Sequence, residues 1–475
     1  MKTLWLTVAV LMLGPAAASA QPVFAGHEIF PASEFAARRA RVIEQLGTGV
    51  AIIQGATERP GEQAFRQNNQ FFYLCGVAEP RAILLIDGRA RTATAFLQPR
   101  NDRREQRGFG PGLYPGPEAA SATGLDAVRD RAEFAAALAA IAAEGRPIHT
   151  PFRPEVLGQA SSGDPAAMWR ATKADPWDGR VSREDAFVAK LRAAAASSEL
   201  KDLDPIIDGL RLIKSPREID LIRAATRIAG LAIMEAMRDA QPGMFEYELQ
   251  ASAEFVFKRL GAYGPSYFAL IATGTNTYYT HYHKATARLH DGDLVQIDYG
   301  PDYKYYQGDV TRVFPASGRF TPRQREHYGI ALELYRALLT SLRPRASAQD
   351  VIRDAVVKMD TAMAAFPFTD PAIEAAAAAY VERYRASKAT SLGHHVGMEV
   401  HDVRGPNPPG TLEPGMVFTI EPALLLDGER LGIRLEDMLL VTESGIENLS
   451  AFVPIEMDAI ESLMAQKGLS DYRLK

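Results

Sequence analysis

The sequence predicts an α+β protein in which sheets are enclosed by helices. Three helix starts in the second half carry capping signatures, and strand-like apolar runs lie between and after them. In the first half, short apolar runs bounded by Gly, Pro or Asp are interspersed with alanine-rich helical stretches. We therefore expect an amino-terminal α/β domain followed by a larger α+β domain built from helix–strand–strand units, with the boundary near residues 190–205.

The first twenty residues have the features of a secretory signal. Lys2 provides a positive start, residues 4–13 form a short apolar run, and Ala18-Ser19-Ala20 is a small-residue cleavage site. The run is shorter than the ~20 residues that a membrane span needs, and an uncleaved anchor is the alternative. We expect cleavage after residue 20, no stable membrane anchor, and a periplasmic or secreted location.

Four segments carry the expected elements of the first half. Residues 50–53 and 82–86 are predicted buried strands. Residues 134–143 are alanine-rich and predict a helix. Residues 101–117 are rich in Arg, Gly and Pro, which predicts a long exposed loop.

The second half alternates helix starts with strands. Capping residues followed three positions later by Glu, Gln or Asp occur at 215–218, 321–324 and 347–350, and the first two include proline at the first helical position. The predicted strands are residues 294–299, 308–314, 416–426 and 432–441.

Composition excludes several classes of function. The chain has 475 residues, 23% charged and 47% hydrophobic, as in ordinary folded proteins rather than disordered or fibrous ones. A formal charge of −5 provides no general attraction to DNA or RNA, so we expect no nucleic-acid partner. The single cysteine, Cys75, excludes an intramolecular disulfide, a Cys-rich zinc site and an iron–sulfur cluster. Any metal must therefore be held by His, Asp and Glu.

Four acidic residues interrupt strands that are otherwise apolar. They are Asp298, Asp309, Glu421 and Glu436. Because a buried carboxylate is costly unless it is paired, protonated or bound to a metal, four in one region indicate a shared counter-charge. Hard divalent cations prefer such oxygen ligands, supplemented by imidazole.

Histidines are concentrated in two short segments. Of nine histidines, three lie in residues 394–401 and two in residues 281–283. Taken singly, each histidine is explained as a hydrogen-bonded core residue, and each aspartate as the end of a turn. Their joint occurrence with the four carboxylates favours a metal centre.

The order of these residues resembles the five-ligand signature of the pita-bread metallopeptidases, which include methionine aminopeptidase, aminopeptidase P and prolidase. The signature comprises Asp298, Asp309, His394, Glu421 and Glu436, and the resemblance extends over residues 205–455. The flanking blocks that match are Asp298-Tyr299-Gly300, Gly308-Asp309-Val310-Thr311-Arg312, Val400-His401-Asp402 and Thr419-Ile420-Glu421-Pro422. Residues 65–76 also resemble a block of the amino-terminal domain of aminopeptidase P. After the signal peptide expected at 1–20, the resemblance implies an aminopeptidase P-like domain at 21–200 and a pita-bread domain at 201–475.

The resemblance implies a site for two divalent metal ions. Asp298 would bind one ion, His394 and Glu421 the other, and Asp309 and Glu436 would bridge them. One imidazole among carboxylates suits Mn²⁺ best by ligand hardness, with Co²⁺, Zn²⁺ or Fe²⁺ as other occupants.

The family's remaining roles fall on four residues. Glu421 would also transfer the proton from the attacking water to the leaving nitrogen. His281 and His401 match histidines that hold the substrate and the tetrahedral intermediate. Arg434 would orient a ligand, the alternative being a surface arginine on an edge strand.

The expected function is an exported aminopeptidase that hydrolyses the first bond of short peptides, with Xaa-Pro as the preferred amino terminus. Aromatic residues that could line its proline pocket are Phe268, Tyr278, Tyr279, Tyr282, Tyr303, Tyr305 and Tyr306. Thr390 stands where aminopeptidase P and prolidase carry a further histidine, which argues against strict proline specificity. The alternatives are a prolidase acting on Xaa-Pro dipeptides and a non-catalytic peptide-binding relative. A homodimer or homotetramer is the default for such a family.

Overall fold

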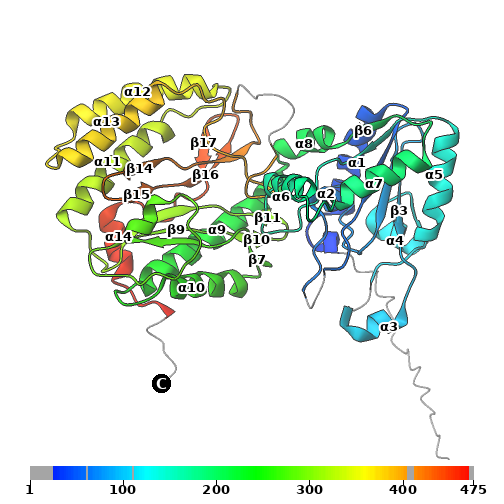
Figure 1. Ribbon diagram of the computed structural model, residues 1–475, viewed down its shortest axis with the longest axis horizontal. Helices are drawn as coiled ribbons and strands as arrows, with labels where there is room; N and C mark the ends of the chain where they lie inside the picture. Colours follow the sequence, from blue (N-terminus) through cyan, green and yellow to red (C-terminus); the bar gives the residue numbers. More distant parts are fainter. Residues whose placement is uncertain (1–24, 60–62, 110–111, 404–410, 470–475) are drawn as a thin grey trace, which may run out of the picture.

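The structure is a computed structural model that describes residues 25–59, 63–109, 112–403 and 411–469. Figure 1 shows two lobes, with the amino-terminal one on the right and the larger one on the left. The predicted signal peptide lies outside the described residues. Within the described part of the chain, none of the helices is both long and apolar enough to cross a bilayer.

The amino-terminal lobe is built on one mixed sheet with the order β4-β3-β2-β1-β5-β6. Its strands are β1 (Val50–Gln54), β2 (Ile83–Asp87), β3 (Thr92–Leu97), β4 (Ala127–Asp130), β5 (Ile148–Thr150) and β6 (Leu200–Asp202). The central strands β1, β2 and β3 pair antiparallel, whereas β4, β5 and β6 join in parallel. The predicted strands at 50–53 and 82–86 are confirmed as β1 and β2.

The amino-terminal lobe also contains helical segments, some of which pack on the two faces of the sheet. They are η1 (Ala25–Glu28), α1 (Ala32–Leu46), α2 (Asn69–Cys75), α3 (Asp102–Arg104), η2 (Glu105–Phe109), α4 (Pro117–Thr123), η3 (Arg131–Glu133), α5 (Phe134–Ala143), α6 (Gly163–Ala174), α7 (Arg183–Ala194) and α8 (Asp204–Leu212). Successive β1 side chains point to opposite faces, so Ala51 and Ile53 enter the main core while Val50 and Ile52 form a second core with α5 and α7. The predicted α/β architecture is confirmed.

The prediction of a long exposed loop at 101–117 is wrong in part, because α3 and η2 give its first half helical structure. Polar contacts between side chains hold this segment in place, and its Gly- and Pro-rich composition does not predict them. Arg100 pairs with Asp102 and Glu105 at 3.0 Å, and the Tyr114 hydroxyl donates to Glu105 at 2.6 Å. Leu113 is buried against the core.

The larger lobe begins with α9, and its helices lie outside its sheets (Figure 1). They are α9 (Pro216–Asp239), α10 (Glu246–Arg259), η4 (Gly274–Tyr278), α11 (Pro322–Leu339), α12 (Ala348–Ala365), α13 (Pro371–Arg385) and α14 (Met457–Met464). The three predicted capping signatures are confirmed: Ser215, Thr321 and Ser347 each accept from the backbone three residues on, and the residue there returns a bond.

Short strands form several small antiparallel sheets inside these helices. They are β7 (Gly264–Pro265), β8 (Leu270–Thr273), β9 (Leu294–Asp298), β10 (Pro301–Tyr303), β11 (Tyr306–Gln307), β12 (Thr311–Pro315), β13 (Val417–Ile420), β14 (Ala423–Leu426), β15 (Leu431–Arg434), β16 (Asp437–Val441) and β17 (Ile446–Asn448). The sheets are β11-β10-β7, β12-β9-β8, β13-β16-β17 and β14-β15.

The acidic residues lie at breaks and ends of strands rather than inside them, which corrects the sequence prediction. The predicted strand 416–426 is divided at Glu421, and the predicted strand 432–441 at Glu436. Asp309 precedes β12, and Asp298 is the last residue of β9. Pro422 follows Glu421 and has no N–H to donate to a neighbouring strand, so the strand pairing stops there. Glu421 therefore lies outside the regular strand.

A buried contact joins the lobes. The guanidinium of Arg66 pairs with Asp302 at 2.9 Å and lies 4.3 Å from the centre of the Tyr305 ring, which stacks on Phe72 at 3.7 Å. Tyr306 is also buried and donates to Glu218 at 2.8 Å. These two tyrosines therefore belong to the core and not to a substrate pocket. The predicted division after residue 200 falls within β6, the last strand of the amino-terminal sheet.

We predict that Arg66→Leu lowers the free energy of unfolding by about 3–5 kcal/mol, because it leaves the Asp302 carboxylate buried without its partner. Arg385→Leu is the matched control, since Arg385 pairs with Asp360 at an exposed site and should change stability by at most about 1 kcal/mol. Urea unfolding followed by tryptophan fluorescence measures both. Equal effects would contradict the assigned role of the buried pair.

Candidate metal centre

Two strands bring the first pair of carboxylates together. In the antiparallel register of β9 and β12, Asp298 lies opposite Thr311. Asp309 lies two residues before Thr311, just outside the strand, and the Tyr267 hydroxyl lies 2.6 Å from both Asp298 and Asp309. An isolated bridge between Thr311 and Glu436 then joins this sheet to the segment between β15 and β16.

A second strand pair adds the remaining ligand candidates. Ile420 of β13 pairs with Asp437 of β16, and the same register one residue further places Glu421 opposite Glu436. The segment that carries His394 runs beside β13, because the Thr419 N–H donates to the His394 carbonyl at 2.9 Å.

Three of the predicted carboxylate ligands meet at the ring of the fourth predicted ligand, His394. Its Nε2 lies 3.4 Å from Asp309, 3.2 Å from Glu421 and 3.9 Å from Glu436. One ligand atom each from Asp309, His394 and Glu436 fall within 4.8 Å of one another. Asp298 joins the group through the Tyr267 hydroxyl, which lies 2.6 Å from both Asp298 and Asp309.

The electrostatics of the group are those of crowded like charges. Burial and the neighbouring Asp298 carboxylate raise the pKa of Asp309 well above its ordinary value, and burial with Asp309 does the same for the pKa of Glu436. Burial alone would lower the pKa of His394, but the hydrogen bond to Glu421 and the charge of Asp309 raise it to about 9. The same imidazole holds the pKa of Glu421 below its ordinary value despite burial.

These donors fit divalent cations. Oε1 of Glu436 is buried and has no hydrogen-bond partner among the described residues, so one acceptor is left unsatisfied. The single proton of Tyr267 cannot satisfy both carboxylates that it faces. Four carboxylates and one imidazole form a donor set of the hardness that suits divalent metal ions.

Two supporting residues were not identified from the sequence. The Tyr267 hydroxyl lies within hydrogen-bond distance of two of the carboxylates and has one proton to donate, and the Thr311 hydroxyl donates to Glu436 at 2.6 Å. Thr311 lies in the block 308–312, which resembles the family, so the sequence carries a signal for it. Tyr267 stands outside every motif, and only the pairing of β8, which follows it, with β9 reveals its position beside Asp298.

Arg434 is buried in the centre and is not a surface arginine. Its Nη2 donates to Asp298, and its Nη1 donates to the Thr280 carbonyl at 2.9 Å. Thr280 directly precedes His281, so one guanidinium connects a ligand candidate to the segment that carries a predicted substrate-holding histidine.

His281 and His401 lie on the more open side of the cluster. The His401 ring is 4.2 Å from the His394 ring and 6.5 Å from the His281 ring, measured between centres. The surrounding protein atoms and the His394 imidazole lower the pKa of His401 to about 4, which favours a neutral ring at neutral pH. The His401 ring thus has both of the other imidazoles within 6.5 Å.

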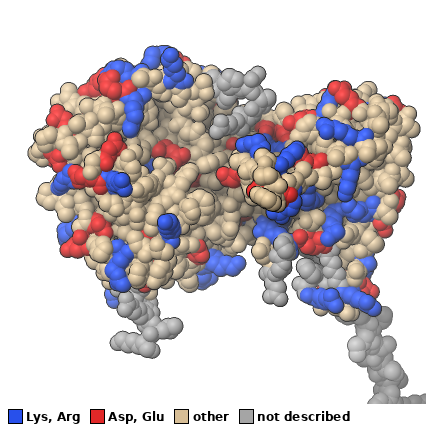
Figure 2. Space-filling model, in the orientation of Figure 1, with Lys and Arg blue, Asp and Glu red and all other residues tan. Residues whose placement is uncertain are grey.

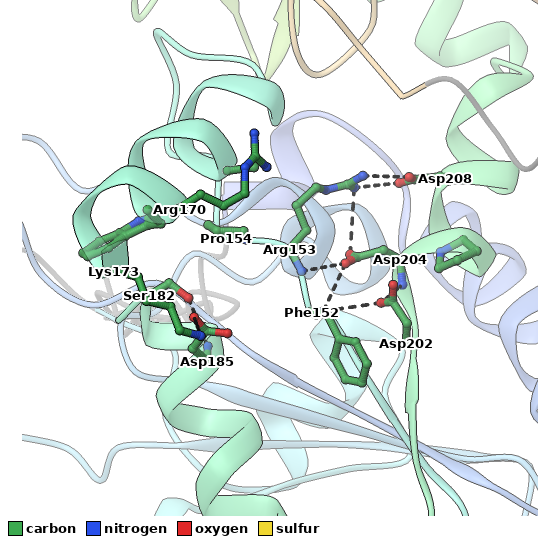
Figure 3. A pocket seen from close by; sticks show the side chains of 13 residues that line it. Phe152, Arg153, Pro154, Arg170, Lys173, Ser182, Asp185, Asp202, Asp204 and Asp208 are labelled. Carbon is green, nitrogen blue, oxygen red and sulfur yellow. Dashed lines mark hydrogen bonds and ion pairs between the residues drawn. The ribbon is translucent and has the colours of Figure 1, made fainter. Parts of the chain in front are cut away.

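Most of the other aromatic candidates make contacts elsewhere. Tyr278 donates to Asp427 at 3.0 Å, Tyr282 donates to Glu246 at 2.9 Å, and Phe268 packs on His283. Thr390 lines a small apolar cavity with Leu392 that contains none of the carboxylates. A larger cavity of about 550 Å³ lies between α6 and the start of α8 (Figure 3) and has no histidine in its lining.

Comparison with known proteins identifies the fold and the family. The model of metallopeptidase family M24 matches residues 220–443, and the aminopeptidase P amino-terminal domain matches residues 35–149. The Xaa-Pro aminopeptidase of Escherichia coli is 33% identical over 458 residues, which cover 91% of this chain and 97% of that protein.

The chain belongs to the metallopeptidase family M24. Proline aminopeptidase P II from Yersinia pestis superposes with a TM-score of 0.72 at 32% identity, covering 92% of this chain and all of that one. E. coli aminopeptidase P with the inhibitor Pro-Leu gives a TM-score of 0.71 at 29% identity, covering 92% and 98%. The expected pita-bread fold is thereby confirmed, and the protein is an aminopeptidase P-like metallo-exopeptidase. Membership of the family implies a site for two divalent metal ions.

We predict that Tyr267→Phe weakens metal binding about 10- to 100-fold, the range typical of losing an outer hydrogen bond to ligands. Tyr299→Phe is the matched control, because the buried Tyr299 hydroxyl donates to Glu254 and not to a carboxylate of the centre. Isothermal titration of Mn²⁺ into the metal-free proteins gives both affinities. A Tyr267→Phe affinity equal to wild type would remove this residue from the centre.

Proposed function

We propose that this enzyme is an Xaa-Pro aminopeptidase that releases the first residue of short peptides. The observation that carries the proposal is the meeting of four carboxylates and one imidazole at one buried place. The E. coli Xaa-Pro aminopeptidase supports it, since the similarity extends over nearly the whole of both chains. A methionine aminopeptidase would ordinarily lack the amino-terminal domain that is present here.

We further propose that residues 1–20 are a cleaved signal, that residues 21–200 and 201–475 are the two domains, and that the mature protein is periplasmic or secreted. The positive start, short apolar run and small-residue site support export. Figure 2 shows acidic and basic side chains interspersed over one face. A homodimer or homotetramer is the assembly we propose.

The proposed metal ligands are Asp298, Asp309, His394, Glu421 and Glu436. Two divalent cations bound there would activate a water molecule at neutral pH and polarise the scissile carbonyl. We propose Mn²⁺ as the native metal by ligand hardness. The solved zinc-substituted E. coli aminopeptidase P in complex with product indicates that such a centre accepts another divalent ion in that relative.

Each remaining residue has a role that its position supports. Glu421 has 28% of its side chain exposed, in contrast to the nearly enclosed Glu436, and its lowered pKa keeps it ionised. It can therefore accept a proton from water at its carboxylate and return that proton to the leaving nitrogen. His281 and His401 would hold the peptide carbonyl and the developing charge on the open side.

Arg434 keeps Asp298 and the segment before His281 in fixed relation through its two bonds. Because Arg434 is buried, water does not compete for these two hydrogen bonds. We propose that it orients the ligand and the histidine together, as a positioning residue rather than as a group that contacts substrate.

A prolidase limited to dipeptides is the second candidate. The Xaa-Pro dipeptidase of Pyrococcus horikoshii is 32% identical, but the match covers only 56% of this chain. Thr390 weakens the argument for strict proline specificity, because a threonine provides neither the shape nor the charge of an imidazole.

We predict that the Mn²⁺-loaded protein releases the first residue from Xaa-Pro-Xaa tripeptides faster than it splits Xaa-Pro dipeptides. A defined peptide library digested with added metal and analysed by mass spectrometry measures both. Cleavage confined to dipeptides would favour the prolidase, and cleavage at bonds without proline would show that proline is not required. No cleavage with any divalent metal would support the non-catalytic relative.

We predict that Glu421→Gln keeps the fold and lowers kcat at least about 100-fold, since proton transfer by a positioned side chain contributes ~10²–10⁴. Glu429→Gln is the control: it removes the same charge from an exposed ion pair with Arg323. Circular dichroism checks the fold, and elemental analysis checks metal content. Near-normal turnover of Glu421→Gln would exclude its role in proton transfer.

A further inference from the structure

Two acidic residues flank His401 in the sequence, Glu399 and Asp402, and both pair with buried cationic side chains. Nη2 of Arg211 donates to Glu399 at 3.0 Å and to Asp402 at 2.6 Å. Nζ of Lys214 lies 3.2 Å from the other oxygen of Asp402. All four of these side chains are almost completely buried. The backbone on both sides of His401 is therefore fixed by charge pairs that have no competing solvent.

The third contact to this segment comes from the amino-terminal lobe. The His401 N–H donates to the hydroxyl oxygen of Ser161 at 2.9 Å. The N–H of the next residue, Ser162, donates to Glu399 at 2.7 Å. Ser161 is 3% exposed, and its own N–H donates to Asp164 at 3.1 Å. A turn of the first domain thus bonds directly to the histidine backbone of the second.

The chain that leads into this turn is itself held at residues 152 and 153, near its start. The N–H groups of Phe152 and Arg153 donate to one oxygen of Asp204 at 3.0 and 2.8 Å. The guanidinium of Arg153 also makes two bonds to Asp208, at 2.8 and 2.7 Å (Figure 3). Such paired bonds between a guanidinium and a carboxylate fix direction as well as distance.

We propose that Ser161 is a positioning residue for His401, so that this histidine is aligned for catalysis only when the amino-terminal domain is docked. The proposal rests on the proposed peptidase function, in which His401 holds the reacting carbonyl. A ring that must meet a developing charge loses effectiveness when its backbone is free to shift by about 1 Å. The Ser161 hydroxyl restricts that freedom at the His401 N–H itself, which the Arg211 and Lys214 pairs do not contact.

The test compares two neighbouring serines. Ser161→Ala removes the acceptor of the His401 N–H, whereas Ser162→Ala keeps its backbone N–H and loses a hydroxyl that has no partner among the described residues. We expect Ser161→Ala to lower kcat on an Xaa-Pro-Xaa tripeptide about 3- to 10-fold with KM within twofold, and Ser162→Ala to change neither.

A second measurement does not depend on activity. Hydrogen exchange of metal-free protein, resolved by fragmentation mass spectrometry, reports the His401 amide directly. We expect faster exchange at this amide in Ser161→Ala and wild-type exchange in Ser162→Ala. Unchanged exchange at His401 in Ser161→Ala would overturn the contact and with it the proposal, whether or not the protein cleaves peptides.

The double variant separates positioning from general loss of structure. In a His401→Ala background, Ser161→Ala should lower kcat no further, because the residue through which it acts is absent. A further loss of the same size there would show that Ser161 acts on the fold and would overturn the proposal. If exchange rises as expected but wild-type protein cleaves no peptide, the proposed function fails while the contact stands.

Discussion

Mutual repulsion among four carboxylates at one enclosed place is the constraint on which this structure depends. Asp309 and Glu436 are each nearly buried, and burial together with their neighbours raises the pKa of both. His394 and Arg434 are the positive side chains in contact with these carboxylates, and two positive charges do not balance four negative ones. A site with this deficit is suited to divalent cations, because bound metal charge offsets the repulsion that the fold maintains.

The scaffold opposes this repulsion with groups behind the site. Arg312 is buried, pairs with Asp437 at 2.7 Å and donates to the carbonyls of Thr311 and Glu436. It thereby fixes the backbone on either side of the Thr311–Glu436 bridge. Since this cation bonds to carbonyls and to Asp437 rather than to a ligand oxygen, it stiffens the strands without competing for the ligand that a metal would bind.

The contact between the lobes gives the first domain a physical part in the site. Arg66 pairs across the junction with Asp302, and Asn69 reaches the carbonyl of Met398 at 3.2 Å. Ser161 then bonds to His401 from the same side. The amino-terminal domain is therefore more than an appended module, because it contacts the segment that carries the histidines at several buried points.

The sequence by itself determined the fold class, the capped helices and the identity of all five ligand candidates. Those features are local: a capping box spans four residues, and an acidic residue among apolar ones is conspicuous without knowledge of its partners. The strand breaks at Glu421 and Glu436 were not foreseen, because an apolar run does not show where a ladder stops. Tyr267, the burial of Arg434 and the Ser161 contact were decided only by tertiary structure. Each depends on strand register or on contacts between segments far apart in the chain. The residues adjacent in sequence do not determine such register or contacts.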